Sequence, residues 1–456
     1  MTGPPIIKSR GVSNSERKLT EICDSTFLKL WTYPNPYKSD GHEMCDLIVV
    51  FEQHVFLFFD RHNTSLENYV DGDFLVAWKR WKKATIDKQI KTVIGAERYL
   101  RNPKNELFLD AKCTQKFPIH IPREKAIVHK IIVANGATKA CLNYSDDNIS
   151  GSLALSYSRD NDRDSETPFT VKLKNKGIIH VFDDENMKTI FSELDTITDL
   201  LAYFEAKEEV IKHTDILSYC AEEDLLARYY LNFDEKEQRH YILPQGEKYN
   251  GIMIPEGDWA EFIKSKAYSR KKSADEISYF WDNLIQITSE NALKGTTGGD
   301  PDIFNRPSAI KEMAKEPRFS RRALSAAIKK SIQNFPSGTG GARNVGLYPS
   351  FFSEKRYVFL AVHIPNFEYE EARELKRKML LIACGAAKLK YPEIKQVVGI
   401  AIEAPHLNEK VAEDFILLRD MSQEMIEDVR EMNAELQFFE TKSLTEERRT
   451  TKQFPD

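Results

Sequence analysis

Long apolar runs are missing from this sequence. No stretch approaches the roughly 20 consecutive apolar residues that are needed to span a bilayer. Residues 1–10 also lack the hydrophobic region of a secretory signal. We therefore expect a cytoplasmic protein without a membrane partner.

Cysteine is scarce, and closely paired cysteines are missing. The six cysteines are scattered, never form a Cys-x-x-Cys pair and mostly lie in apolar surroundings. This spacing argues against a structural zinc site and favours buried thiols in a reducing cytosol.

A phosphate-binding glycine loop and an overall basic charge are also missing. The glycine-rich stretches at residues 295–301 and 337–341 lack the Gly-Lys-Ser/Thr ending of a Walker loop, so we interpret both as linkers. The formal net charge is −5, so a nucleic-acid surface would have to come from local clusters. With 456 residues, 41% apolar and 30% charged, the chain predicts a globular protein of roughly two or three domains.

Two apolar runs bracketed by carboxylates form the most informative stretch. Residues 47–51 and 55–59 are rich in β-branched and aromatic side chains, which predicts strands covered on both faces, and the polar residues 52–54 predict a turn. Asp46 opens the first strand and Asp60 closes the second, so a hairpin would bring them to one edge. Two carboxylates held that close favour a divalent cation between them. The alternative is that both strands meet solvent at an Asp.

A helix acid is a third candidate ligand. Leu19, Ile22, Cys23 and Phe27 recur at helical spacing after a start at Ser13 or Asn14, with Glu16 beside this apolar side. Glu16 either caps the first turn or reaches into a site.

Residues 78–100 predict a strongly basic helix. Its first half has a single acid, Asp87, and two tryptophans. Basic side chains beside aromatic rings can hold phosphates and stack on bases, whereas an ordinary solvated helix face normally mixes both signs of charge. We therefore favour nucleic-acid binding through Trp78, Lys79, Arg80, Lys82, Lys83 and Lys91.

The following segments complete an α/β domain. Apolar runs predict strands at residues 126–134, 151–157 and 178–182, and a helix from Asp183 or Asp184 to about His213. The order helix, three strands, helix, strand, helix is that of a small domain with a mixed sheet.

The other half of the chain is less informative. Residues 214–300 predict a helical connecting region, and residues 301–456 predict a second α/β domain with strands at 356–363, 397–402 and 415–418. This second domain has isolated His363 and His406 but no cluster of catalytic residue types. We expect it to serve specificity, binding of a protein partner, or self-association.

The N-terminal part, residues 13–213, resembles the restriction-endonuclease-like superfamily, the PD-(D/E)XK nucleases, and more loosely its NERD-type members. The resemblance implies that Glu16, Asp46 and Asp60 bind Mg²⁺ or Mn²⁺. His62 stands where the family has a lysine. Related cores sometimes supply the missing group from the following helix, which here implies Lys88 and Gln89.

The resemblance implies a metal-dependent nuclease. The metal would activate a water molecule for hydrolysis of a phosphodiester, with His62 as a general base or as a donor to the phosphate. DNA is the expected substrate ahead of RNA, and the family implies a role in bacterial genome defence, including antiviral defence, or in repair. The alternatives are a catalytically inactive nuclease-like scaffold that binds nucleic acid or a protein, and a purely structural protein, which fits the paired acids and the basic helix least well.

Overall fold

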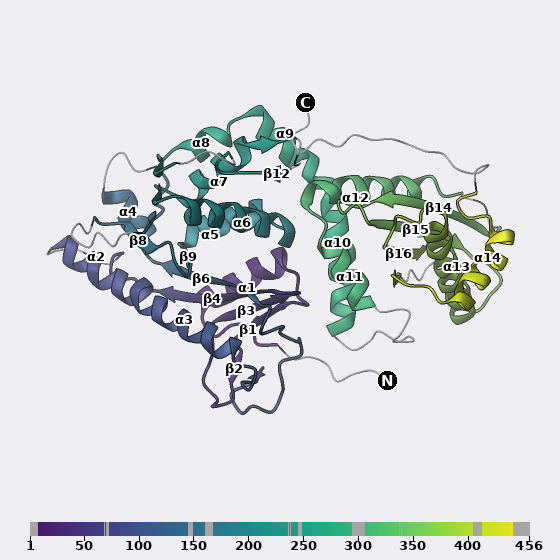
Figure 1. Cartoon of the computed structure of the whole chain (residues 1–456), viewed down its shortest axis with the longest axis horizontal. Coiled ribbons are helices and arrows are strands. Elements are labelled where there is room, and N and C mark those ends of the chain that lie inside the picture. Colours follow the sequence, from purple (N-terminus) through teal and green to yellow (C-terminus); the bar gives the residue numbers. More distant parts are fainter. Residues whose placement is uncertain are drawn as a thin grey trace. The chain divides into compact units, whose positions relative to one another are not determined.

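The computed structural model describes residues 8–67, 69, 73–144, 149–159, 167–235, 237, 239–244, 249–293, 306–336, 338, 340–404 and 413–440. The chain divides between Ser265 and Lys266 into an N-terminal unit and a C-terminal unit. Both units combine helices with a mixed sheet, which confirms the predicted α/β class (Figure 1). The division falls within residues 214–300, and this stretch contains strands at residues 216–219 and 251–254, so the prediction of a separate, helical connecting region was wrong.

A five-stranded sheet is the centre of the N-terminal unit. Its strand order is β1 (Thr32–Pro34), β3 (Leu47–Phe51), β4 (His54–His62), β6 (Ile127–Asn135), β9 (His180–Phe182). The first three strands are antiparallel, whereas β4, β6 and β9 run parallel. Every residue of β3 is buried, as the unbroken apolar run requires. The predicted hairpin is confirmed, with its turn at Glu52 and Gln53.

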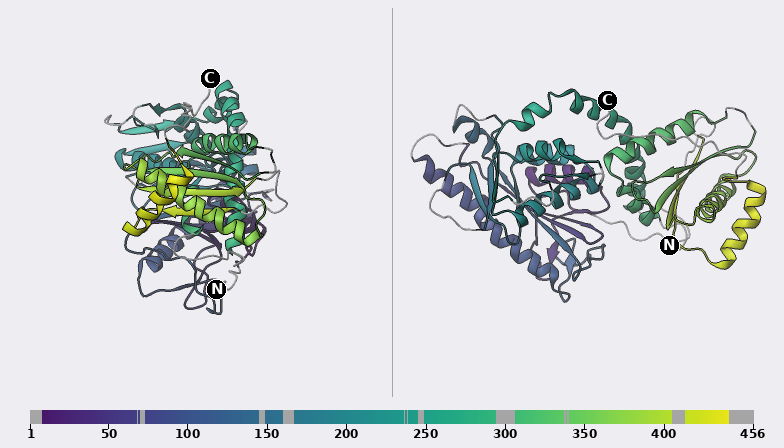
Figure 2. Two further views of the ribbon diagram at one scale, coloured as in Figure 1. Left: turned by 90° about the vertical axis from the view of Figure 1, so that its right-hand side faces the viewer. Right: turned by 45° about the horizontal axis from the view of Figure 1, so that its top comes forward.

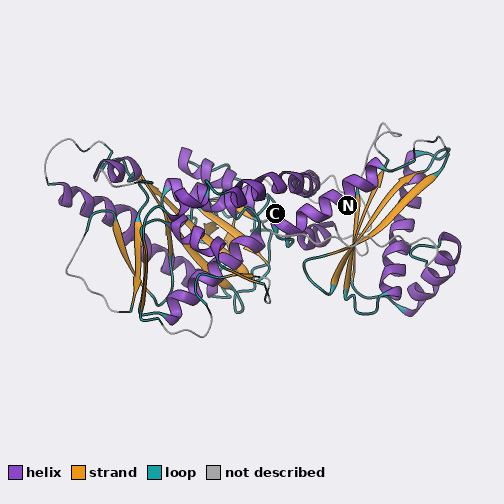
Figure 3. Cartoon of the chain, turned by 90° about the horizontal axis from the view of Figure 1, so that it is seen from above, coloured by secondary structure: helices purple, strands orange, loops and turns teal. Residues whose placement is uncertain are grey.

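Helices cover both faces of this sheet (Figures 1 and 3). On one face lie α1 (Asn14–Thr26), α5 (Asp184–Glu193) and α6 (Ile197–His213), joined to β4 by aromatic contacts such as Phe56 with Phe204. On the other lie α2 (Phe74–Lys82), a π-helical turn (Lys83–Asp87) and α3 (Lys88–Arg101). There Lys130 of β6 bonds Glu97 of α3 at 2.7 Å. Side chains that alternate along β4 and β6 therefore face different helices.

A second sheet has the strand order β13 (Gly251–Ile254), β10 (Ile216–Tyr219), β7 (Ala154–Ser158), β8 (Thr170–Lys174). Helix α7 (Glu222–Leu231) lies against β10. Lys207 of α6 and Glu222 of α7, both fully buried, form an ion pair at 2.6 Å. The short elements of this unit are β2 (Tyr37–Lys38), β5 (Leu107–Phe108), α4 (Thr138–Tyr144), β11 (Phe233–Asp234), β12 (Arg239–His240) and α8 (Asp258–Phe262).

The C-terminal unit is built on a four-stranded sheet. Its order is β14 (Ala342–Pro349), β15 (Lys355–His363), β16 (Gln396–Glu403), β17 (Asp414–Leu418). Helices α13 (Tyr369–Lys390) and α14 (Gln423–Leu436) lie on one side of it (Figure 2). The remaining elements are α9 (Lys266–Asp275), a 3-10 turn (Glu276–Ser278), α10 (Tyr279–Leu293), α11 (Arg306–Ala314) and α12 (Arg318–Gln333).

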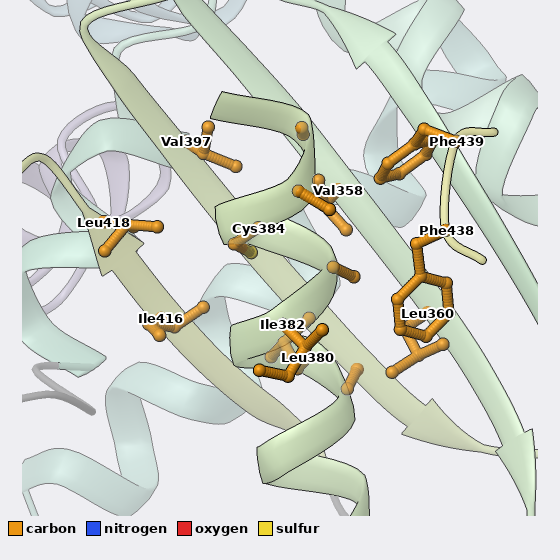
Figure 4. Packing of buried hydrophobic residues seen from close by; sticks show 14 of the residues in the cluster. Val358, Leu360, Leu380, Ile382, Cys384, Val397, Ile416, Leu418, Phe438 and Phe439 are labelled. Atoms are coloured by element: carbon orange, nitrogen blue, oxygen red, sulfur yellow. The ribbon is translucent and has the colours of Figure 1, made fainter. Parts of the chain in front are cut away.

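The core of this unit lies between α13 and the sheet (Figure 4). Val358 and Leu360 of β15 are fully buried there, together with Leu380 and Cys384 of α13. At Gly399 of β16, a Cβ atom would lie 2.5 Å from the Cys384 Sγ. A residue without a side chain is therefore needed where α13 crosses this strand.

Several predicted boundaries are corrected by the structure. The single helix predicted from Asp183 to His213 is two helices, because the chain leaves helical geometry at Leu194 and Thr196 caps a new start. The basic helix begins at Phe74, capped by Asp73. Strand β14 was not predicted at all, and the stretch at residues 295–301 lies outside the described residues. Within the described ranges, no helix has the length and apolar character to cross a bilayer.

Candidate active site

Carboxylates gather where β3 begins and β4 ends. The Asp46 Oδ2 accepts a hydrogen bond from the Asp60 backbone N–H at 2.7 Å. The same carboxylate accepts from the Arg61 guanidinium at 3.1 Å. Burial raises the pKa of Asp46 to about 6, despite the opposing effect of Arg61. The hairpin thus brings Asp46 to the end of β4, where it contacts the Asp60 backbone, and a cation shared by the two carboxylates stays a prediction.

Asp60 is buried at the same end. Asn135, the last residue of β6, donates through Nδ2 to the Asp60 Oδ1. The Asp60 Oδ2 is buried and has no hydrogen-bond partner among the described residues. Burial raises the pKa of Asp60, and the Glu16 charge adds to this, although Ser15 and Asn135 act in the opposite direction.

Glu16 contacts both the start of its own helix and the loop after β1. Its Oε2 accepts from the Val12 N–H at 2.8 Å, next to the Ser13 cap of α1, and also from the Asn35 Nδ2 at 3.0 Å. Partial burial acts to raise the pKa of Glu16, but these hydrogen bonds hold it below its ordinary value. Asn35 donates to Glu43 as well, so it bridges two carboxylates.

Glu43 is the fourth acid of the cluster. Burial raises its pKa, and the charge of Glu16 adds to this, against the effects of Asn35 and Arg61. In the carboxylate cluster, defined as Glu16, Glu43, Asp46 and Asp60, the Arg61 guanidinium lowers the pKa of three members.

The proposed three-ligand set is not compact. We consider groups of three His, Cys, Asp or Glu side chains whose ligand atoms all lie within 4.8 Å of one another. Among the described residues, His129, His180 and Glu208 form such a group. Glu16, Asp46 and Asp60 do not form such a group. Arg61 and the Asp60 N–H bond Asp46 instead, and Asn35 bonds Glu16.

The residues expected to replace the family lysine have different surroundings. His62 is exposed at the end of β4, and Lys88 is exposed at the start of α3. Gln89 is buried, and its Oε1 has no hydrogen-bond partner among the described residues. No hydrogen bond or ion pair joins these three side chains to the carboxylate cluster in the described part of the chain.

The basic helix keeps its charges at the surface but buries its tryptophans. Trp78 and Trp81 are fully buried and stack on each other, with 5.4 Å between ring centroids. Assigning Trp78 to base stacking was therefore wrong, because a side chain in the core cannot meet a base. Lys82 is half-buried, 3.8 Å from Asp87. The exposed basic residues are Lys79, Arg80, Lys83, Lys88 and Lys91.

No protein-family model, curated protein or solved structure matches this chain.

Sequence reasoning missed Asn35, Glu43, Arg61 and Asn135. One signal was present for Asn135, since it directly follows an apolar strand and the parallel pairing of β4 with β6 aligns it with His62. For Asn35 the contact depends on a left-handed backbone, φ +49°, in the loop after β1. Nothing in the spacing of the sequence predicts that contact.

Proposed function

We propose that the N-terminal unit is a metal-dependent nuclease with a restriction-endonuclease-like core. The order of elements carries the proposal. The helix α1 is followed in the main sheet by three antiparallel strands, β1, β3 and β4. A helical segment, α2 to α3, then leads to β6, which is parallel to β4. Glu16, Asp46 and Asp60 stand on the helix, the second strand start and the third strand end of this order, as the resemblance requires.

The donor atoms suit Mg²⁺ or Mn²⁺. Carboxylate oxygens are the ligands that hard cations prefer, and the buried Asp60 Oδ2 is an acceptor without a partner among the described residues. The raised pKa values of Asp46 and Asp60 also fit carboxylates that lack sufficient positive charge. A bound ion would polarise the phosphoryl oxygen and lower the pKa of its water.

The protein's own groups would position the substrate. Arg61 must release Asp46 when a metal binds, and its guanidinium then matches a phosphate in a bidentate manner. His62 is exposed two residues after Asp60 in the chain, from where it would accept a proton or donate to the phosphate. The exposed basic residues of α2 and α3 would hold further phosphates.

The expected substrate remains nucleic acid, DNA ahead of RNA, and genome defence or repair remains a family-level expectation. A cytoplasmic location and a partner-binding or self-association role for the C-terminal unit also remain predictions.

A nuclease-like scaffold that binds without cleavage is the second candidate. The Arg61–Asp46 ion pair favours it, because the guanidinium stands where a cation would bind Asp46. The replacement of the family lysine by His62 favours it too.

Cleavage assays separate these candidates. The full chain is incubated with single- and double-stranded DNA and RNA in Mg²⁺ or Mn²⁺. Asp60→Asn should reduce cleavage to background, whereas Asp40→Asn, at an exposed turn of the same unit, should leave it unchanged. Cleavage that persists in Asp60→Asn would contradict the proposed metal site, and binding without any cleavage would favour the scaffold.

His62 provides a second comparison. His62→Lys restores the family residue and should preserve or increase cleavage. His62→Ala should lower it by about 10²- to 10⁴-fold, the usual contribution of one general acid or base. Equal rates in all three proteins would remove His62 from the mechanism.

A further inference from the structure

A cluster of histidines lies at the opposite end of the main sheet from the carboxylates. His129 is near the start of β6, His180 is the first residue of β9, and Glu208 is on α6. The parallel pairing aligns Ile131 of β6 with His180 of β9. His129 lies two residues before Ile131, so its side chain is on the same face of the sheet as that of His180. The α6 helix covers this face, which explains how Glu208 reaches the two rings.

The distances in this cluster match a metal site. The Glu208 Oε1 lies 3.3 Å from the His180 Nε2 and 3.7 Å from the His129 Nδ1. A tetrahedral ion with ligand bonds of 2.0 to 2.2 Å separates its ligand atoms by about 3.3 to 3.6 Å. All three ligand atoms lie within 4.8 Å of one another.

The His129 ring shows a buried nitrogen that needs a partner. His129 is 3% exposed, and its Nδ1 has no hydrogen-bond partner among the described residues although it faces the Glu208 carboxylate. At 3.7 Å this contact is too long for a hydrogen bond. Two electron-rich atoms held in this way require a cation or a proton between them.

The surrounding groups hold the ligands in a metal-binding orientation. The His129 Nε2 meets the His54 Nδ1 at 3.1 Å, so a proton donated there leaves the Nδ1 lone pair free. Lys212 bonds the other oxygen of Glu208, Oε2, at 3.0 Å, which leaves Oε1 facing the histidines. The His180 ring stacks on Phe204, with 4.3 Å between centroids, and is thereby fixed.

We infer that His129, His180 and Glu208 bind one divalent transition-metal ion, with zinc as the best match. Two imidazoles and one carboxylate form a donor set typical of zinc, whereas Mg²⁺ prefers oxygen ligands. The ion would join α6 to β6 and β9, and a water molecule would complete its coordination. This site is independent of the proposed nuclease function, whose metal ligands are the carboxylates.

Metal titration of the full chain, without an affinity tag and after chelator treatment, tests the inference. Co²⁺ serves as the spectroscopic probe and Zn²⁺ as its competitor. The wild type should bind one equivalent of Co²⁺ with the strong visible absorption of a tetrahedral site, and Zn²⁺ should displace it. At free Zn²⁺ a hundred times the Kd, the melting temperature of the N-terminal unit should rise by roughly 5 to 10 °C.

The variants separate this site from adventitious binding. Glu208→Gln keeps the size of the side chain and should weaken Zn²⁺ and Co²⁺ binding by about 100-fold or more, as should His180→Gln. His213→Gln is the matched control, because His213 is exposed on the same helix and its bond within the described structure is to the Glu209 backbone carbonyl. It should bind as the wild type does.

Three results would overturn the inference. They are the absence of stoichiometric Co²⁺ or Zn²⁺ in the wild type, unchanged affinity in folded Glu208→Gln, or equal losses in His213→Gln. The first would mean that a proton, not a metal, lies between His129 and Glu208. Circular dichroism of each variant shows that the comparison is made between folded proteins, and Glu208→Gln suffices if His180→Gln fails to fold.

Discussion

Replacing Lys207 by Met should destabilise the N-terminal unit severely. The Lys207 ammonium bonds both oxygens of Glu222, at 2.6 and 2.7 Å, and neither side chain is exposed. Burial lowers the pKa of Lys207, against the charge and hydrogen bonds of Glu222 and the charge of Glu208. Without the ammonium, Glu222 keeps the hydroxyls of Tyr203 and Tyr219 but remains a buried carboxylate without a cation.

The magnitude follows from this geometry. Breaking a buried ion pair by removing one partner costs about 3 to 5 kcal/mol, and for a unit of this size each kcal/mol lowers the melting temperature by roughly 2 to 4 °C. A decrease of about 6 to 20 °C is therefore expected for Lys207→Met. Differential scanning calorimetry in a chelator, with the chain free of metal, measures it.

A double variant provides the control. Lys207→Met with Glu222→Gln removes both charges and keeps an acceptor for Tyr203 and Tyr219, so it should recover most of the lost stability. A Lys207→Met protein that melts within about 3 °C of the wild type would refute the reasoning. So would a double variant that is no more stable than the single one.

Three further predictions follow from other sites. Burial raises the pKa of Glu223 from 4.5 to about 7, so the folded state retains a proton that the unfolded state loses. The free energy of unfolding should therefore fall by up to about 3 kcal/mol as the pH rises from 4.5 to 7. Urea unfolding at several pH values should show a weaker pH dependence of stability in Glu223→Gln. Gly399→Ala should cost about 1 to 3 kcal/mol in the C-terminal unit, because its Cβ would meet the Cys384 Sγ, and thermal melting should detect a second, earlier transition. The triple variant Lys79→Glu, Lys82→Glu and Lys83→Glu reverses charge on the basic helix. It should weaken nucleic-acid binding by orders of magnitude and reduce its salt dependence, as measured by fluorescence anisotropy. Unchanged affinity at low salt would assign these lysines to a solvated face.

The sequence predicts strands and helices well where the pattern of apolar residues is clear. Residues 47–51 form a strand because every side chain is apolar and is covered on both faces. The hairpin was predictable for the same reason, and with it the approach of Asp46 to the end of β4.

Long-range contacts could not be predicted in the same way. The pairing of His129 with Glu208 depends on how α6 crosses two strands, and no local pattern encodes that crossing. The tryptophans gave a misleading signal for a related reason. Trp78 is next to Lys79 in the sequence, but neighbouring residues of a helix point in different directions. Its side chain lies on the buried side of α2, where it packs against Phe169.

The pairing of β4 with β6 links the carboxylate cluster to the histidine cluster at the other end of the sheet. β4 and β6 are paired from His54 and Ile127 to His62 and Asn135, so about 26 Å of continuous pairing separates the two ends. A slip of one residue would turn the side chains of β4 relative to β6 at both ends at once. A misaligned chain would therefore lose the His54–His129 contact and the Asn135–Asp60 contact together. Either contact, followed by NMR, reports whether the distant end has also assembled.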